Sequence, residues 1–105
     1  MPIGSTDFST SVYSYDDVAG DLNLTSFSVA VDERSGKLPL IRRALARSRA
    51  RGLGAREAPR GLKLFASCWA PPVWMTANNT TLNARLRDAP GGPTHRAFAK
   101  YVIAR

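Results

Sequence analysis

Hydrophobic positions are unevenly spaced along the chain, and their spacing predicts a series of alternating elements. Residues 2–8 are short and mixed, which is typical of a strand end that runs into a loop. Residues 9–36 are rich in Ser, Asp, Tyr and Gly, with isolated Leu and Phe, and indicate a long surface loop. Loops of this length inside a compact domain tend to carry function.

Helical spacing covers about residues 38–51. Pro39 suits the first turn, where a missing N–H group costs nothing. Gly52 and Gly54 offer an end to the helix. The connector that follows, up to about Gly61, contains Arg, Gly, Ala and Pro without apolar periodicity. The helix face predicted to be apolar or small consists of Leu40, Ile41, Ala44, Leu45 and Ser48.

The best predicted strand is Leu62–Ser67, with the sequence LKLFAS. Because Leu64, Phe65 and Ala66 are consecutive apolar residues, we expect both faces of this strand to be covered, as in a parallel sheet. The strand runs into CWAPPVWM, where two prolines prevent further pairing.

A polar loop rich in Asn and Gly is predicted for residues 76–93, and a last helix follows it. Thr94 is the expected N-cap of this helix, directly after Pro93. The predicted apolar side of the helix presents Phe98, Tyr101 and Val102, and the chain stops within the helix at Arg105.

The resulting order is strand, loop, helix, strand, loop, helix, which predicts an α/β class with parallel strands. Two strands and two helices are too few to close such a sheet, since a parallel strand needs neighbours and helices on both faces. We therefore expect an incomplete piece of a larger α/β domain that is interrupted at both ends.

The composition shows that the chain is basic. The net charge is +7, and seven arginines fall between Arg42 and Arg60, whereas six of the eight acidic residues lie in the first 33 positions. This asymmetry indicates one solvated basic segment, and we expect no nucleic-acid partner. The alternative is a small module that binds nucleic acid or an anionic surface through Arg42–Arg60, and it predicts salt-dependent binding that is lost when those arginines are neutralised.

Several classes of protein are excluded by what the sequence does not contain. A single cysteine, Cys68, excludes an internal disulfide and a cysteine-based metal cluster, and a single histidine, His95, excludes a multi-histidine metal site. We expect neither a metal nor another cofactor. No apolar run approaches the roughly 18 residues that cross a bilayer, and the first residues lack the pattern of a secretory signal.

Two clusters of candidate ligand-binding residues follow the predicted strands, where α/β barrels place their working residues. One is Asp7-Phe8 and the other is Trp69, with Trp74 a few residues further on. A carboxylate accepts hydrogen bonds from adjacent sugar hydroxyls, and a Trp ring offers a flat apolar face with one N–H donor. Packing and capping are the alternative roles for these residue types, and spacing alone does not separate the two.

The motifs SxDFS and YSYDD within Pro2–Asp17, together with ASxWxPPxWM within Leu64–Asn78, resemble the glucosylceramidases of glycoside hydrolase family 30. The helix LPLIRRAL and the closing THRAFAKY are similar to the same family. The resemblance implies a (β/α)₈ TIM barrel with an attached β-sandwich, and hydrolysis of the β-glucosyl bond of glucosylceramide in sphingolipid metabolism. It places the whole chain, residues 1–105, from the end of barrel strand 2 through helix 2 and strand 3 to the start of helix 3.

The resemblance also implies roles for individual residues. Asp7 would hold glucose hydroxyls, Phe8 would stand beside it at the pocket wall, and Trp69 would contact the same sugar. Trp74 matches a tryptophan that is expected to pack rather than to bind. The implied substrate is glucosylceramide or another β-glucoside. This would be a membrane-lipid substrate, although no transmembrane segment is predicted in the chain. The resemblance also implies a lysosomal or extracellular enzyme.

The chain departs from the family pattern at three places. Ser11 replaces an arginine, Ser67-Cys68-Trp69 replaces Ser-Pro-Trp, and an Arg/Gly-rich insert at residues 48–61 lengthens the connection between helix and strand. The family's acid/base and nucleophile glutamates have no counterpart in the chain. Its only glutamates are Glu33 and Glu57, and neither follows a predicted strand. Retaining hydrolysis needs two such carboxyl groups, so we expect no hydrolysis by these 105 residues alone.

Overall fold

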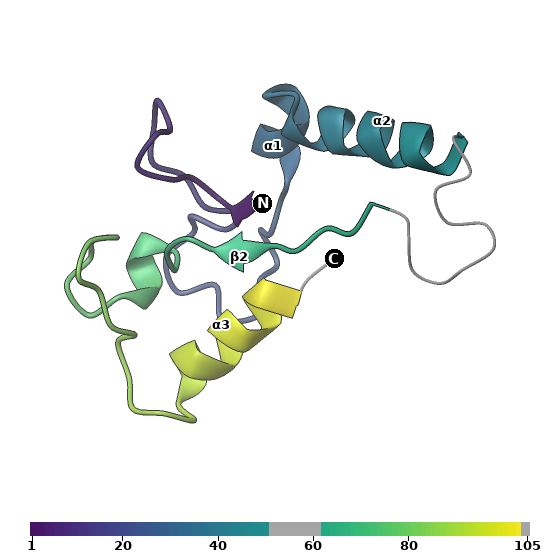
Figure 1. Ribbon diagram of the computed structural model, residues 1–105. Coiled ribbons are helices and arrows are strands. Elements are labelled where there is room, and N and C mark those ends of the chain that lie inside the picture. Colours follow the sequence, from purple (N-terminus) through teal and green to yellow (C-terminus); the bar gives the residue numbers. More distant parts are fainter. Residues whose placement is uncertain (51–61, 104–105) are drawn as a thin grey trace. The chain divides into compact units, whose positions relative to one another are not determined.

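The computed structural model describes residues 1–50 and 62–103, and the chain forms two compact units (Figure 1). The first unit combines Met1–Ser28 with Ala66–Arg105, and the second is Val29–Phe65. Residues 51–61 of the Arg/Gly-rich insert 48–61, with the expected helix stop at Gly52 and Gly54, lie outside the described residues, as do residues 104–105.

A two-stranded parallel sheet organises the first unit. Strand β1 (Pro2–Ile3) pairs with β2 (Ser67–Cys68), with Pro2 opposite Ser67 and Ile3 opposite Cys68. The Ser67 N–H group extends the pairing by donating to the Met1 carbonyl at 2.9 Å. The predicted parallel arrangement and the strand end near the N-terminus are therefore confirmed.

The predicted strand at Leu62–Ser67 is wrong in its extent. Only its last residue belongs to β2, which continues to Cys68, and the preceding residues are in no strand. Because β1 has two residues, it offers a hydrogen-bonding partner for only two positions of β2. The expectation that both faces are covered also fails here, since Leu64 and Phe65 are exposed.

The core of the first unit is small and largely aromatic. Its buried members are Tyr15, Met75, Ala97 and Tyr101. Phe27 packs edge-on against two of them, with ring centroids 5.6 Å from Tyr15 and 5.7 Å from Tyr101. These contacts join segments far apart in the sequence, so the core holds the N-terminal loop and the last helix together.

Helix α3 (Pro93–Ile103), yellow in Figure 1, supplies two of the core residues. Thr94 is not its N-cap, contrary to prediction. The helix begins at Pro93, so Thr94 lies within its first turn. The Thr94 N–H group donates to the Asp88 carboxylate at 2.6 Å. The cap thus comes from a residue in the preceding loop. Phe98 and Tyr101 pack inward as predicted, whereas Val102 is exposed.

Residues 76–93 form the predicted polar loop, but a hairpin organises its first half. The loop follows a 3₁₀ turn, η1 (Val73–Met75). An antiparallel bridge joins Thr76 to Leu86, and the Ala77 N–H group donates to the Arg85 carbonyl at 2.9 Å. We call residues 76–87 the hairpin loop.

The second unit consists of helices α1 (Ala30–Arg34) and α2 (Lys37–Ala50). The prediction of α2 is confirmed over the described residues. Helix α1 falls within the stretch predicted to be loop, so that prediction is wrong at its end. Salt bridges connect the two helices: Glu33 pairs with Arg42, and Lys37 pairs with Asp32 at 2.8 Å. Periodicity does not reveal α1, because a helix of five residues is too short to show a period in the sequence.

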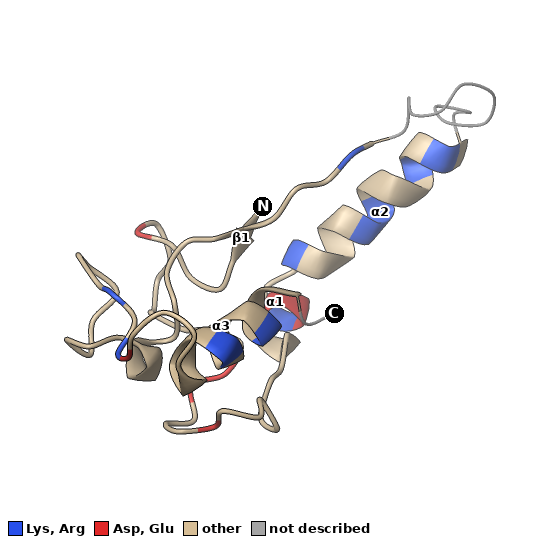
Figure 2. Cartoon of the chain, turned by 90° about the horizontal axis from the view of Figure 1, so that it is seen from below, with Lys and Arg blue, Asp and Glu red and all other residues tan. Residues whose placement is uncertain are grey.

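Helix α2 has a half-buried side and an exposed basic side. Ile41, Leu45 and Ser48 are partly buried, as predicted, but Leu40 and Ala44 are exposed. Figure 2 shows the basic residues distributed along this helix. No described residue of α2 is fully buried.

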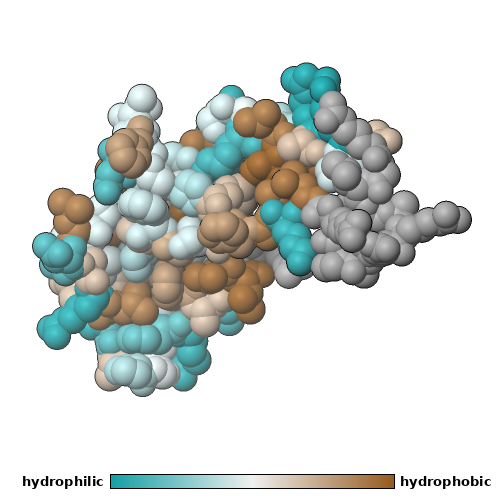
Figure 3. Space-filling view, viewed as in Figure 1, coloured by the Kyte–Doolittle hydropathy of each residue, from teal (hydrophilic) through white to brown (hydrophobic). Residues whose placement is uncertain are grey.

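Hydrophobic residues also remain at the surface, and Figure 3 shows them among polar residues on one face of the molecule. Exposed examples in the first unit are Phe8, Val12, Val18, Trp69, Leu82 and Ile103. Among residues 1–50 and 62–103, no helix has the length and apolar character needed to cross a membrane.

Candidate functional site

The loop after β1 positions Asp7. Gly4 has φ +76°, and a Cβ atom there would approach the Tyr13 carbonyl oxygen to 3.2 Å, so glycine fits both the conformation and the space. The Ser5 N–H group donates to the Tyr13 carbonyl at 3.0 Å, and the Tyr13 N–H group donates to Ser5 Oγ at 3.0 Å. These two bonds close a loop of residues 5–13 that contains Asp7.

The residues after β2 position Trp69. The Cys68 thiol donates to the Ala70 carbonyl at 3.0 Å, which stabilises the turn around the tryptophan. Burial raises the pKa of this thiol. Pro71 and Pro72 follow, after the strand pairing has ended at Cys68. Trp69 is 53% exposed, so its ring is available to a ligand.

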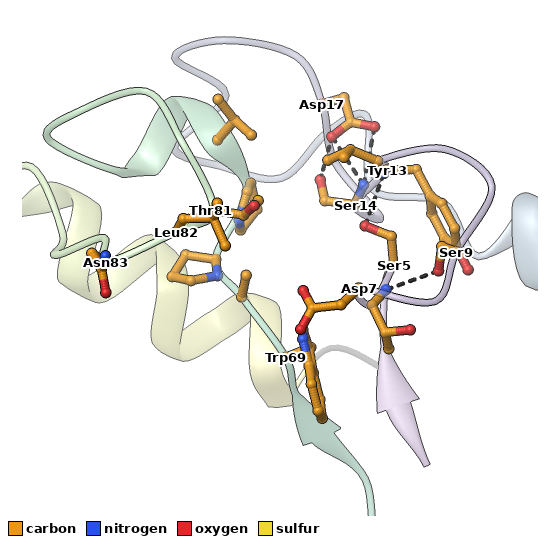
Figure 4. Close-up of a pocket in the computed structure, with 16 residues that line it drawn as sticks. Ser5, Asp7, Ser9, Tyr13, Ser14, Asp17, Trp69, Thr81, Leu82 and Asn83 are labelled. Carbon is orange, nitrogen blue, oxygen red and sulfur yellow. Dashed lines mark hydrogen bonds between the residues drawn. The ribbon is translucent and has the colours of Figure 1, made fainter.

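A cavity of about 420 Å³ lies at the end of the two strands (Figure 4). Its volume falls within the range of about 300–1,000 Å³ that is usual for small-molecule sites. Because β1 and β2 run parallel, the residues that follow them meet at one edge of the sheet. The lining residues are Ser5, Thr6, Asp7, Ser9, Val12, Tyr13, Ser14, Asp17, Trp69, Ala70, Pro71, Pro72, Val73, Thr81, Leu82 and Asn83.

Asp7 and Trp69 share this cavity, and in Figure 4 the Asp7 carboxylate points toward the Trp69 indole. Among the described residues, Asp7 has no hydrogen-bond or ion-pair partner, so its oxygens can accept hydrogen bonds from a ligand. Asp17, the second carboxylate of the lining, is already engaged. It accepts bonds from the Ser14 N–H group at 3.0 Å and from the Ser14 hydroxyl at 2.6 Å.

The other two sequence candidates lie outside this cavity lining. Phe8 is 92% exposed and projects from the loop that carries Asp7. Trp74 packs against the core, and its indole N–H group donates to the Asp16 carbonyl at 2.9 Å. The prediction that Trp74 packs is therefore confirmed.

The structure also adds lining residues that the sequence did not single out. Ser5 and Ser14 come from the same loop region as Asp7, within the stretches SxDFS and YSYDD. Thr81, Leu82 and Asn83 come from the hairpin loop, 12 to 14 positions after Trp69. No spacing rule links the hairpin loop to Asp7, because only the folded chain brings them to one cavity.

A second cavity, of about 440 Å³, lies beside the start of α3. Asp88 and His95 face one another there, with His95 Nδ1 2.7 Å from Asp88 Oδ1. Desolvation raises the pKa of Asp88, but hydrogen bonds from His95 and Thr94 outweigh it and lower the pKa to about 2. Asp88 caps the helix by accepting from the Thr94 N–H group, and His95 contacts the other oxygen of the same carboxylate. A structural role therefore explains the positions of both side chains.

Metal ligation has no support in the part of the chain that the structure describes, where no three His, Cys, Asp or Glu side chains gather at a place suited to an ion.

Comparison with known proteins gives the class to which this fold and cavity belong. All 105 residues match the glycosyl hydrolase family 30 TIM-barrel domain, and the chain belongs to this family. It is 36% identical over 104 residues to a Caenorhabditis elegans protein named as a glucosylceramidase. It is 34% identical over 105 residues to the lysosomal acid glucosylceramidase of Mus musculus.

A relative with a different activity in its name is the endo-1,6-beta-D-glucanase of Neurospora crassa, which is 35% identical over 109 residues. Each of these three matches covers 97% or 98% of this chain. The same matches cover only 18% to 20% of the relatives' length. The chain therefore spans about a fifth of the curated relatives that it matches.

Proposed function

We propose that this chain forms one wall of the glucose-binding pocket of a glucosylceramidase-type hydrolase that acts on glucosylceramide or a related β-glucoside. The observation that carries the proposal is the meeting of Asp7 and Trp69 in one cavity at the ends of two parallel strands. The unpartnered Asp7 carboxylate accepts two sugar hydroxyls, and the half-exposed Trp69 ring covers the apolar face of the sugar.

The same proposal places the chain within the barrel. β1 is the end of barrel strand 2, α2 is helix 2, β2 belongs to strand 3, and α3 opens helix 3. The parallel register of β1 and β2 and the match to the family over residues 1–105 support this placement. Residues 48–61 are then an insert in the connection between helix 2 and strand 3. Exposed Phe8, next to Asp7, is proposed to contact the substrate or a neighbouring segment at the pocket rim.

Catalysis itself needs groups beyond this chain. A retaining glycosidase uses two carboxyl groups about 5–5.5 Å apart, one as acid/base and one as nucleophile. In the cavity, Asp17 is held by Ser14 and Asp7 is assigned to the sugar hydroxyls. Glu33 is paired with Arg42 in the second unit, and Glu57 lies outside the described residues. We therefore propose that the 105 residues bind a β-glucoside without cleaving it, and that the intact enzyme works in a lysosome or outside the cell.

Nuclear magnetic resonance of the two indole N–H groups tests the binding. The chain has two tryptophans, and Trp74→Phe assigns the signals. On titration with methyl β-glucoside, we expect the Trp69 signal to shift with saturation and the Trp74 signal to stay in place, because Trp74 already donates to Asp16. Absence of any saturable shift at Trp69 would contradict the proposal.

Variants of the chain test in the same measurement whether Asp7 contributes to binding. Asp7→Asn removes a charged acceptor, and hydrogen bonds to charged groups contribute about 1.5–3 kcal/mol, so the affinity should fall about tenfold or more. Glu33→Gln removes a carboxylate outside the cavity and serves as the matched control. A fluorogenic β-glucoside should show no saturable turnover by the purified chain, and turnover would contradict the assignment of catalysis to other segments.

A further inference from the structure

The walls of the Asp7 cavity differ in polarity. Hydroxyl and carboxylate groups of Ser5, Ser14 and Asp17 occupy one side, and Leu82 projects from the opposite side, between the polar residues Thr81 and Asn83 (Figure 4). Pro72 and Val73 continue the apolar lining. A ligand that matches both walls has hydroxyl groups at one end and an apolar group at the other.

Leu82 is 66% exposed although it lines the cavity, so its side chain is open to a ligand. Its backbone is held on both sides. The Leu82 N–H group donates to Thr80 Oγ1 at 3.2 Å, and its carbonyl accepts from Asn78 Nδ2 at 3.3 Å. These two bonds fix the peptide groups that flank the side chain, and therefore the direction in which the Cβ atom points.

The base of the hairpin loop is held as well. The Arg87 guanidinium donates to the Trp74 carbonyl at 3.2 Å, to the Thr76 carbonyl at 3.1 Å and to Asn79 Oδ1 at 2.6 Å. The antiparallel bridge between Thr76 and Leu86 closes the same loop. A loop tied at its base and near its tip presents Leu82 to the cavity in a defined position.

We infer that Leu82 is a specificity-determining residue that contacts an apolar group on the aglycone of the bound β-glucoside. The inference rests on the proposed function and deepens it, because it assigns the polar wall to the sugar and the hairpin loop to the group attached to it. Leu82 thereby favours glucosides with an alkyl aglycone over those with a small polar one. The contact adds apolar burial without altering the hydrogen bonds to the sugar.

A pair of ligands tests this assignment on the full chain. Dissociation constants for methyl and octyl β-glucoside are measured from the Trp69 indole signal, below the concentration at which the octyl glucoside forms micelles. Octyl β-glucoside should bind about tenfold more tightly, because burial of about two of its methylenes at roughly 0.8 kcal/mol each corresponds to that factor. Leu82→Ser should remove most of that preference, because it should weaken binding of octyl β-glucoside far more than binding of methyl β-glucoside. Leu22→Ser, at an exposed leucine of the same unit outside the cavity lining, should retain the preference.

The outcomes distinguish failure of the glucose site from failure of the Leu82 contact. If methyl β-glucoside does not bind the unsubstituted chain, both the proposed function and the Leu82 assignment fail. If methyl β-glucoside binds but octyl β-glucoside gains nothing, or if Leu82→Ser keeps the gain, the Leu82 assignment is overturned and the glucose site stands.

Discussion

The hydroxyl oxygen of Tyr101 accepts a hydrogen bond from the Tyr15 N–H group at 3.0 Å, across 86 positions of sequence. Tyr101 is 1% exposed, and burial raises the pKa of its hydroxyl to about 12. The bond anchors α3 to the segment that continues from the Asp7 loop. The shape of the candidate sugar site therefore depends on a core contact outside the cavity.

Tyr101→Phe should destabilise the first unit while preserving its packing. The change leaves the buried Tyr15 N–H group without its acceptor, and an unsatisfied buried group costs about 1–3 kcal/mol. Urea denaturation followed by tyrosine and tryptophan fluorescence measures the loss. Tyr101→Leu also removes the ring contacts with Phe27 and Phe98, so it should cost more than the phenylalanine variant. Equal stabilities of Tyr101→Phe and the unsubstituted chain would show that the hydrogen bond contributes nothing.

Gly4→Ala should impair both stability and the cavity. An L-residue in the left-handed region costs about 1–2 kcal/mol, and the new Cβ atom would approach the Tyr13 carbonyl to 3.2 Å. The Ser5–Tyr13 pair then has to shift, and Asp7 moves with it. Gly20→Ala is the matched control, since Gly20 has φ +81° but nothing within 4 Å of its added Cβ. Both variants should lose stability, and only Gly4→Ala should also weaken binding of methyl β-glucoside.

Arg87→Met should loosen the hairpin loop without unfolding the protein. Three acceptors lose their donor, but the arginine is exposed and water can replace it. Amide hydrogen exchange of residues 76–87 should accelerate about tenfold or more, because local opening depends on such bonds, whereas exchange in α3 should be unchanged. Arg87→Lys keeps the charge but lacks the planar fork of donors, so it should rescue exchange only in part. A uniform acceleration across the first unit would instead indicate global destabilisation.

Acidification should destabilise the protein below about pH 4 through Asp21 and Asp88. The pKa of Asp21 is lowered to about 2 by hydrogen bonds from Ser26 and Thr25, and that of Asp88 is also about 2. Because both folded values lie below the ordinary value of 3.8, the stabilisation is present above pH 3.8 and is lost as the pH falls through 2. Thermal melts between pH 5 and 2 should show a smaller decline for Asp88→Asn than for the unsubstituted chain.

Asp16 should act in the opposite direction. Its side chain is 1% exposed and one carboxylate oxygen, Oδ2, has no hydrogen-bond partner among the described residues. Burial raises its pKa above 3.8, the Val18 N–H group opposes the rise, and the nearby carboxylates of Asp21 and Asp17 add to it.

A raised folded pKa means that the fold favours the protonated carboxyl group. Its stabilising contribution is complete below pH 3.8 and is lost as the pH rises through the folded value. Asp16→Asn should therefore flatten the decline in melting temperature on the alkaline side of pH 4. An unchanged slope in this variant would mean that another group titrates there.

The sequence predicts correctly the elements that carry strong local signals. Helix α2 follows from apolar spacing and from Pro39 in its first turn, and α3 follows from Pro93 and its inward residues. The limits of β2 could not be found this way, because they are set by the two residues of β1 that pair with it. Helix α1 stays hidden, since five residues with two ion pairs carry no periodic pattern.

The same contrast holds for the site. Asp7 and Trp69 were found because each follows a strand and belongs to a motif. Leu82 was missed, since its place in the cavity depends on a hairpin loop whose fold is set by hydrogen bonds from Arg87, Asn78 and Thr80. Spacing does not encode such bonds.

The thiol beside Trp69 has a practical consequence. Cys68 is the single cysteine of the chain, it belongs to β2, and its Sγ donates to the Ala70 carbonyl. The thiolate is the form that attacks an alkylating reagent, and burial disfavours the thiolate here. Alkylation should therefore be slow while β1 and β2 are paired and fast once β2 separates. The rate of labelling at this position therefore reports how often β2 separates from β1.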